Sequence, residues 1–243
     1  MTAGRAHGAL HAEVLDALGA RLVSADHDDP AHLAPGTVLT LEAISREYAV
    51  STPVAREAVR VLESMGLLAS RRRVGVTVQP RATWNVFDPR LIRWRLSGED
   101  RTAQLLSLSE LRRGFEPVAA SLAAERATPT QCADLAAAVS DMTVRGRDGD
   151  LEAYLVADVR FHATLLEASG NEMIRALAQV VAEVLAGRTH HDMMPARPNP
   201  EAIALHDAVA RAVRDRDPAG AERAMRSIID EAAAAMRREH GGS

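Results

Sequence analysis

Apolar residues recur at steps of three and four along most of the chain, a spacing that predicts amphipathic helices. The pattern predicts a first helix over residues 10–23, which the polar run from Asp26 to Pro35 ends. A short helix over about 41–48, a break at 49–51 and a longer helix over about 52–64 follow. The pattern then changes to β-prone segments at 67–69 and 74–78, which predict a small hairpin.

This order of elements is that of a winged helix-turn-helix, which we expect in residues 1–80. Residues 81–100 contain Pro89, Gly98 and both tryptophans, and they predict a linker with one short helix over 89–96. The remainder, 101–240, predicts an all-α bundle with the Asn199-Pro200 and Asp217-Pro218 pairs as helix starts. Its expected helices lie near 103–126, 130–143, 150–169, 171–188, 200–215 and 218–238. The fold class is therefore mainly α.

Composition agrees with this picture and narrows the function. The 243 residues are 47% hydrophobic but only 3% aromatic, which favours packed helices over sheets. A lone cysteine, Cys132, excludes an intramolecular disulfide and a thiolate-rich metal cluster. Residues 1–20 lack the uninterrupted apolar run of a signal peptide, and no segment is long enough to span a membrane. We therefore expect a cytoplasmic protein with no membrane partner.

The helix over 52–64 has one apolar face and one polar face. Val54, Ala58, Val61, Leu62 and Met65 share the first, and the polar face presents Ser51, Thr52, Arg56 and Arg60. Arginines on a free face suit phosphates or guanine edges, although Glu57 and Glu63 would also make this an ordinary solvated face. The tip of the hairpin adds Arg71, Arg72 and Arg73, which can neutralise phosphates beside a helix in the groove.

Polar side chains interrupt the apolar faces of two later helices. Asp158 and His162 stand four apart in the helix over 150–169, and His206 faces inward in the helix over 200–215. One carboxylate and two imidazoles suit zinc, nickel or manganese and leave coordination positions open. The alternative is a hydrogen bond between Asp158 and His162, with His206 merely buried nearby.

Arg112 lies in the middle of an apolar stripe in the helix over 103–126. A buried guanidinium needs an anion. Glu116, one turn further on, is one candidate partner, and the carboxylate of a bound metabolite is the other.

The stretch from Val50 to Val78 resembles the DNA-binding signature of the GntR family of bacterial regulators. The resemblance rests on Arg56-Glu57-Ala58, on Gly66-Leu67-Leu68 and on Gly75 in the hairpin. It implies a homodimer that places the helix over 52–64 in the major groove of a palindromic operator in double-stranded DNA. Thr52 and Glu42 stand where the family usually has arginines, which leaves more of the binding to Arg56 and the hairpin arginines.

Residues from about 103 to 235 resemble the C-terminal ligand-binding domain of the FadR subfamily, the FCD domain. Its metal-binding members use an Asp-x-x-x-His pair and two later histidines, and the phrases DVRFHATLLEASGN and ALHDAV supply Asp158, His162 and His206. Ile228 stands where a fourth ligand, histidine, is expected. The same resemblance assigns Arg112 and Asn171 to effector binding.

The phrase Trp84-Asn85-Val86-Phe87-Asp88-Pro89 resembles the members that respond to sugar acids such as galactonate or gluconate. The prediction is thus a transcription regulator, acting as a repressor, whose operator affinity is controlled by a small carboxylate. A metal-dependent hydrolase or lyase using Asp158, His162 and His206 is the alternative, but no general acid or base is evident beside the three. A purely structural helical dimer would leave Arg112 and the inward histidines unexplained.

Overall fold

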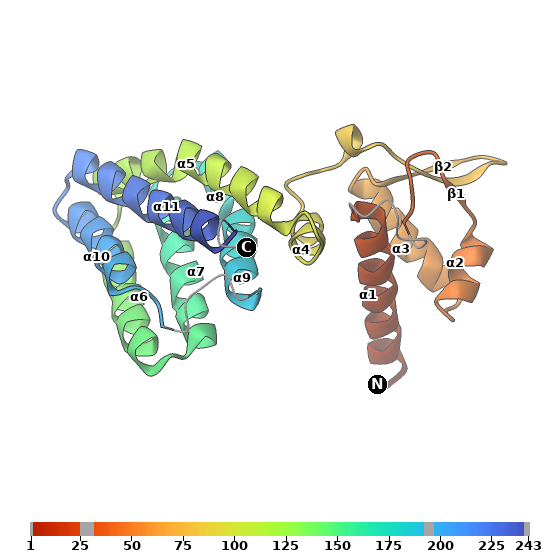
Figure 1. Ribbon diagram of the computed structural model, residues 1–243, viewed down its shortest axis with the longest axis horizontal. Coiled ribbons are helices and arrows are strands. Elements are labelled where there is room, and N and C mark those ends of the chain that lie inside the picture. Colours follow the sequence, from red (N-terminus) through yellow and green to blue (C-terminus); the bar gives the residue numbers. More distant parts are fainter. Residues whose placement is uncertain (1, 25–31, 192–196, 241–243) are drawn as a thin grey trace. The chain divides into compact units, whose positions relative to one another are not determined.

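The computed structural model describes residues 2–24, 32–191 and 197–240. The chain divides into two compact units, residues 1–101 and 102–243 (Figure 1). The first unit contains α1 (Thr2–Val23), β1 (Val38–Leu39), α2 (Leu41–Glu47), α3 (Thr52–Ser64), β2 (Leu68–Arg71), β3 (Gly75–Val78), a 3-10 turn (Arg81–Thr83) and α4 (Pro89–Leu96). The second contains α5 (Arg101–Arg126), α6 (Pro129–Asp148), α7 (Leu151–Ala168), α8 (Glu172–Arg175), α9 (Ala178–His190), α10 (Pro200–Arg214) and α11 (Pro218–His240).

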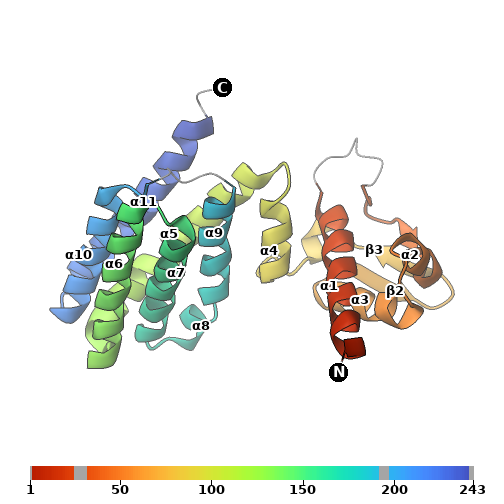
Figure 2. The same cartoon turned by 90° about the horizontal axis from the view of Figure 1, so that it is seen from below.

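The core of the first unit forms where α1, α3 and the small sheet meet. Leu18, Leu62 and Leu67 are among its fully buried side chains. Figure 2 shows α1 and α3 side by side, as their packing contacts require. The apolar face of α3 that the sequence predicts is buried, so its opposite face is left free.

The sheet has three strands in the order β1-β3-β2, all antiparallel. The hairpin of β2 and β3 was expected, but β1 was missed because two residues are too few to show an alternating pattern. β1 pairs Val38 with Thr77 and Leu39 with Val76. This pairing ties the start of α2 to the hairpin that follows α3.

The short helix α4 packs within the first unit. The Nε1 of Trp94 donates to Asp16 Oδ1 at 2.9 Å, and its ring lies against Gly19 of α1. A Cβ at Gly19 would lie 2.4 Å from that ring, so glycine is required for the contact. Much of the segment expected to be a linker thus belongs to the compact unit that carries α3.

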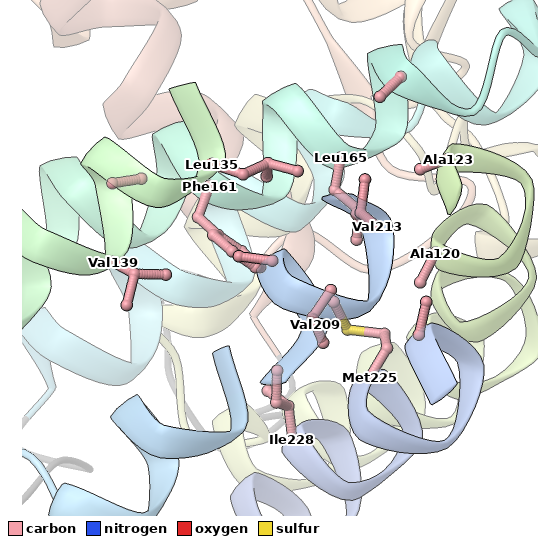
Figure 3. Packing of buried hydrophobic residues seen from close by; sticks show 14 of the residues in the cluster. Ala120, Ala123, Leu135, Val139, Phe161, Leu165, Val209, Val213, Met225 and Ile228 are labelled. Atoms are coloured by element: carbon pink, nitrogen blue, oxygen red, sulfur yellow. The ribbon is translucent and has the colours of Figure 1, made fainter. Parts of the chain in front are cut away.

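The second unit is a helical bundle with its own core. Phe161 and Leu165 of α7 pack there with residues of α5, α6, α10 and α11, among them Ala123, Leu135, Val209 and Met225 (Figure 3). The helix starts predicted at Asn199 and Asp217 are confirmed, because Asn199 accepts from Glu201 N at 3.0 Å and Asp217 from Gly220 N at 2.9 Å.

Three predictions of helix bounds were wrong. α1 begins at Thr2, eight residues before the predicted start at residue 10. α6 runs to Asp148 rather than ending near 143, and Gly149 in the left-handed region (φ 73°) forms its C-cap. The single helix expected over 171–188 is two helices, α8 and α9, separated at Ala176 and Leu177. In the described parts of the chain, no helix has the length and apolar character needed to cross a membrane.

Candidate metal centre and nucleic-acid interface

Asp158, His162 and His206 come together in the core of the second unit. Asp158 and His162 lie one turn apart on the same face of α7, and His206 reaches them from α10. The Nε2 atoms of His162 and His206 each lie 3.4 Å from Asp158 Oδ1. One ligand atom from each of the three residues lies within 4.8 Å of the other two, and all three residues are buried.

The atoms of Asp158, His162 and His206 that face one another are better placed to bind a metal ion than to form hydrogen bonds with each other. Asp158 Oδ1, His162 Nε2 and His206 Nε2 face one another, are buried and have no hydrogen-bond partner of acceptable geometry among the described residues. His162 Nδ1 also lacks such a partner, although it lies within ion-pair distance of Glu116 Oε2. Three unsatisfied buried polar atoms would be costly. A divalent cation bound by all three would satisfy them, and this donor set is one that zinc, nickel or manganese accepts.

Outer contacts orient both imidazoles toward that point. His206 Nδ1 lies 2.6 Å from the carbonyl oxygen of Ala202, and His162 Nδ1 lies 2.8 Å from Glu116 Oε2. With each Nδ1 turned away, each Nε2 faces Asp158. A histidine held by a carboxylate or carbonyl on its far nitrogen is the usual arrangement of a metal ligand.

Glu116 links this cluster to Arg112. Arg112 donates from Nε to Glu116 Oε1 at 2.5 Å and from Nη2 to Oε2 at 3.3 Å, and both side chains are buried. Burial alone would raise the pKa of Glu116, but Arg112 and His162 together lower it to about 2. Glu116 is therefore ionised. Of the two anions considered as partners of Arg112, Glu116 and a metabolite carboxylate, Glu116 is the one in contact with it.

At Asp158 and His162 of α7, burial and the neighbouring groups also shift the pKa in opposite directions. Burial would raise the pKa of Asp158, yet the close imidazoles of His162 and His206 hold it well below its usual range. Burial would lower the pKa of His162, but Glu116 and Asp158 raise it. Asp158 is thus a carboxylate, and a cation bound there would displace any proton from His162.

A cavity of about 260 Å³ opens beside the three residues. Helices α5, α7, α9, α10 and α11 supply its lining, which includes Arg112, Asp158, His162, Arg188, His206, Ile228 and Glu231. Ile228 packs with Met225 and Val209 in the apolar core (Figure 3). Position 228, where the FCD pattern has a fourth metal ligand, is therefore an apolar part of the cavity lining.

The structure separates the two residues assigned to the effector. Arg112 lines the cavity. Asn171 is not among the lining residues, because its Oδ1 caps α8 by accepting from Met173 N at 2.9 Å and Ile174 N at 3.4 Å. Asn171 therefore serves as the N-cap of α8, and we do not propose it as an effector-binding residue.

Sequence reasoning missed Arg188, whose guanidinium lines the cavity from α9. The signal was available, since Val181, Leu185 and Arg188 continue one stripe at steps of four and three. It also missed Glu231, three residues beyond Ile228 on α11.

The residues predicted to meet DNA lie on the surface of the first unit. Ser51, Thr52, Arg56 and Arg60 are exposed along α3, and Arg60 makes a long, exposed ion pair with Glu57, at 3.5 Å. Arg71, Arg72 and Arg73 are exposed at the turn of the hairpin. Glu63 Oε1 accepts from Ser70 N at 2.6 Å, which fixes the hairpin against the end of α3.

Gly75 has a structural role in this surface. Its φ is +121°, and a Cβ there would lie 2.7 Å from the carbonyl oxygen of Leu39 in β1. Only glycine allows this close approach of β1 to β3.

A winged helix-turn-helix with an arginine-bearing free helix face, followed along the chain by a helical bundle, is the arrangement of a DNA-binding transcription regulator. Comparison with known proteins agrees: residues 29–78 match the bacterial regulatory proteins of the gntR family, and residues 107–231 match the FCD domain. The chain belongs to the GntR family, and its FCD domain places it in the FadR subfamily.

Individual relatives are also transcription regulators. The chain is 31% identical to the galactonate operon transcriptional repressor of Escherichia coli K12, over 80% of this chain and 85% of that protein. It is 29% identical to the transcriptional repressor NanR of Citrobacter rodentium, over 77% and 72% of the two chains. The solved structure of E. coli McbR/YncC has the same fold, with a TM-score of 0.55 at 19% identity, covering 95% of this chain and 98% of that one.

Proposed function

We propose that this regulator is a repressor whose operator affinity is controlled by a small hydroxylated monocarboxylate, bound with a divalent metal in the cavity of the second unit. The observation that best supports this proposal is the set of three buried polar atoms on Asp158, His162 and His206, which face one another at the wall of that cavity without hydrogen-bond partners among the described residues. A metal with three protein ligands keeps open positions, which oxygen atoms of a metabolite can take.

The size of the cavity and the relatives support a sugar acid. About 260 Å³ suits a compact metabolite better than a long acyl chain. The galactonate operon repressor is a relative that matches 80% of this chain. Galactonate and gluconate are therefore the first compounds to test.

We further propose that the protein acts as a homodimer on a palindromic operator. Two copies of α3 then enter successive major grooves, and the hairpin arginines contact phosphates beside them. Ligand binding favours a different arrangement of the dimer, in which the spacing of the two α3 helices no longer matches the half-sites.

The metal is tested on the purified protein by elemental analysis and by thermal unfolding with added zinc, nickel or manganese. Metal binding to the folded state raises the unfolding temperature, and we expect that rise to be lost in His206→Ala. The matched control is His190→Ala, because His190 is an exposed histidine outside the cavity. A protein that shows no metal-dependent stabilisation, or a rise that His206→Ala retains, contradicts the metal assignment.

A further inference from the structure

We propose that Arg188 is the residue that binds the carboxylate of the effector, in place of Arg112. This inference rests on the proposed function, since it names the side chain that recognises the ligand in the same cavity. It follows from how the two guanidiniums of the cavity are partnered.

Arg112 is already committed to another anion. Two of its nitrogen atoms face the two oxygens of Glu116, at 2.5 and 3.3 Å, and only 2% of the residue is exposed. A ligand carboxylate at this guanidinium would have to compete with a buried, paired carboxylate, whose loss of partner is costly. Arg112 therefore neutralises Glu116, which in turn orients His162.

Arg188 is in the opposite condition. Its Nε is buried and has no hydrogen-bond partner among the described residues, while the rest of the side chain is partly exposed where it lines the cavity. Burial and the nearby charge of Arg112 lower the pKa of Arg188, and Asp158 and Glu231 oppose this. A guanidinium stays charged through such changes, so it needs an anion. A carboxylate entering the cavity would supply one.

The charges around the cavity favour a ligand with a single negative charge. Arg112 and Arg188 face Glu116, Asp158 and Glu231, which leaves one net negative charge when both histidines are neutral ligands. A divalent cation converts this to one net positive charge. A monocarboxylate then neutralises the site, whereas a phosphorylated sugar or a dicarboxylate would leave excess negative charge among buried groups.

The remaining wall defines the rest of the ligand. Leu185, Ile228 and Ala232 are buried apolar residues of the lining. Beside Arg188 and the metal-facing side, the lining offers the polar side chains of Tyr154, Asn199 and Glu231. A hydroxylated acid places its carboxylate at one of these and its hydroxyl groups at the others. Galactonate and the uncharged polyol galactitol differ only at the end that Arg188 would bind, and they therefore make a matched pair of probes.

The test is calorimetric titration of galactonate and of galactitol into the metal-loaded protein and its Arg188→Gln and Arg188→Lys variants. We expect the unaltered protein to prefer galactonate, and Arg188→Gln to weaken galactonate binding about 10- to 100-fold with little change for galactitol. Arg188→Lys keeps the charge without the planar fork and should recover part of the affinity. Arg113→Gln is the control, since it removes an exposed arginine of α5 that pairs with Asp230.

Stability and metal content separate binding from a structural role. Because Arg188 has an unsatisfied buried donor, Arg188→Gln should unfold without ligand at the same temperature as the unaltered protein or higher, with the same metal content. An arginine that merely holds the bundle together would lose stability instead. Unchanged galactonate affinity in Arg188→Gln, or a loss that appears only with unfolding or metal loss, overturns the inference.

The outcomes also separate this inference from the proposed function. If galactonate binds and weakens operator binding equally in the unaltered protein and in Arg188→Gln, the proposed function stands and the role of Arg188 is refuted. If neither galactonate nor gluconate binds the unaltered protein, the sugar-acid function itself is refuted, together with the role of Arg188.

Discussion

At the scale of single residues, Glu116 joins an arginine to a candidate metal ligand. It accepts from Arg112 and lies 2.8 Å from His162 Nδ1. We predict that Glu116→Gln lowers metal affinity about 10- to 100-fold, because His162 loses the carboxylate that orients it and raises its basicity. Competition with a chelator of known affinity measures this change.

A matched variant on the same helix face of α5 is Ser109→Ala, which removes a hydroxyl that donates to the Leu105 carbonyl oxygen at 2.8 Å. That variant should bind metal as the unaltered protein does. Equal metal affinities in Glu116→Gln and Ser109→Ala would show that Glu116 does not support His162.

Ile228 offers a gain of function. It stands where the FCD pattern has histidine, and it lines the cavity next to the three candidate ligands. We predict that Ile228→His binds metal more tightly, because four protein ligands replace three. The apo variant should be less stable by about 1–3 kcal/mol, since a polar ring enters an apolar wall. Metal titration followed by thermal unfolding measures both changes, and weaker metal binding would contradict the prediction.

The sequence predicts some of these residues and not others, for a physical reason. Asp158, His162 and His206 interrupt apolar stripes, and periodicity alone shows that they face inward. It does not show which partners they meet, because Glu116 comes from another helix and its distance to His162 depends on packing. Asn171 differs from these residues, because its side chain accepts hydrogen bonds from the first turn of α8 and so has a local partner.

At the scale of elements, the turn after α3 depends on Gly66. Its φ is +76°, and a Cβ there would lie 2.1 Å from the carbonyl oxygen of Thr83. We predict that Gly66→Ala lowers the free energy of unfolding by more than about 2 kcal/mol, because it adds a backbone clash to the cost of the left-handed conformation. Urea unfolding measures this loss.

Gly36→Ala is the matched control for that variant. Gly36 also has a positive φ, +90°, but a Cβ there would meet nothing within 4 Å. Its cost should be about 1–2 kcal/mol, that of the conformation alone. If the two alanine variants are equally stable, the contact of Gly66 with Thr83 contributes nothing.

Strongly periodic elements were predictable, and the two-residue strand β1 was not. α3 has the residue range that its apolar stripe predicts, with Ser51 just before it and Met65 just after. β1 has two residues and depends on pairing with β3, which no local pattern records. α6 passes its predicted end and includes Gly146, and the residue that ends it is Gly149, in the left-handed region.

At the scale of the whole molecule, the chain separates two tasks between two compact units. We predict that Arg56→Ala weakens operator binding about 10- to 100-fold at fixed salt, because an exposed side chain of α3 is lost from the groove. Metal binding and the response of thermal stability to galactonate should be unchanged. Arg145→Ala is the control, as it removes an exposed arginine of α6 in the other unit.

Operator titrations by fluorescence anisotropy measure these affinities. Equal operator affinities for Arg56→Ala and Arg145→Ala would show that α3 does not read the DNA as we propose. A loss of the galactonate response in Arg56→Ala would instead show that the two tasks are not separate.

In the function we propose, a metabolite bound in the second unit controls DNA binding by the first. The most direct test is titration of the full-length protein onto a palindromic duplex from the surroundings of its own gene, at one moderate salt concentration, with and without galactonate and metal. We predict a clear preference for this duplex over a shuffled one, and an affinity that falls about 5- to 150-fold when galactonate is added. Equal affinity for both duplexes, or an operator affinity that neither galactonate nor gluconate changes, would contradict it.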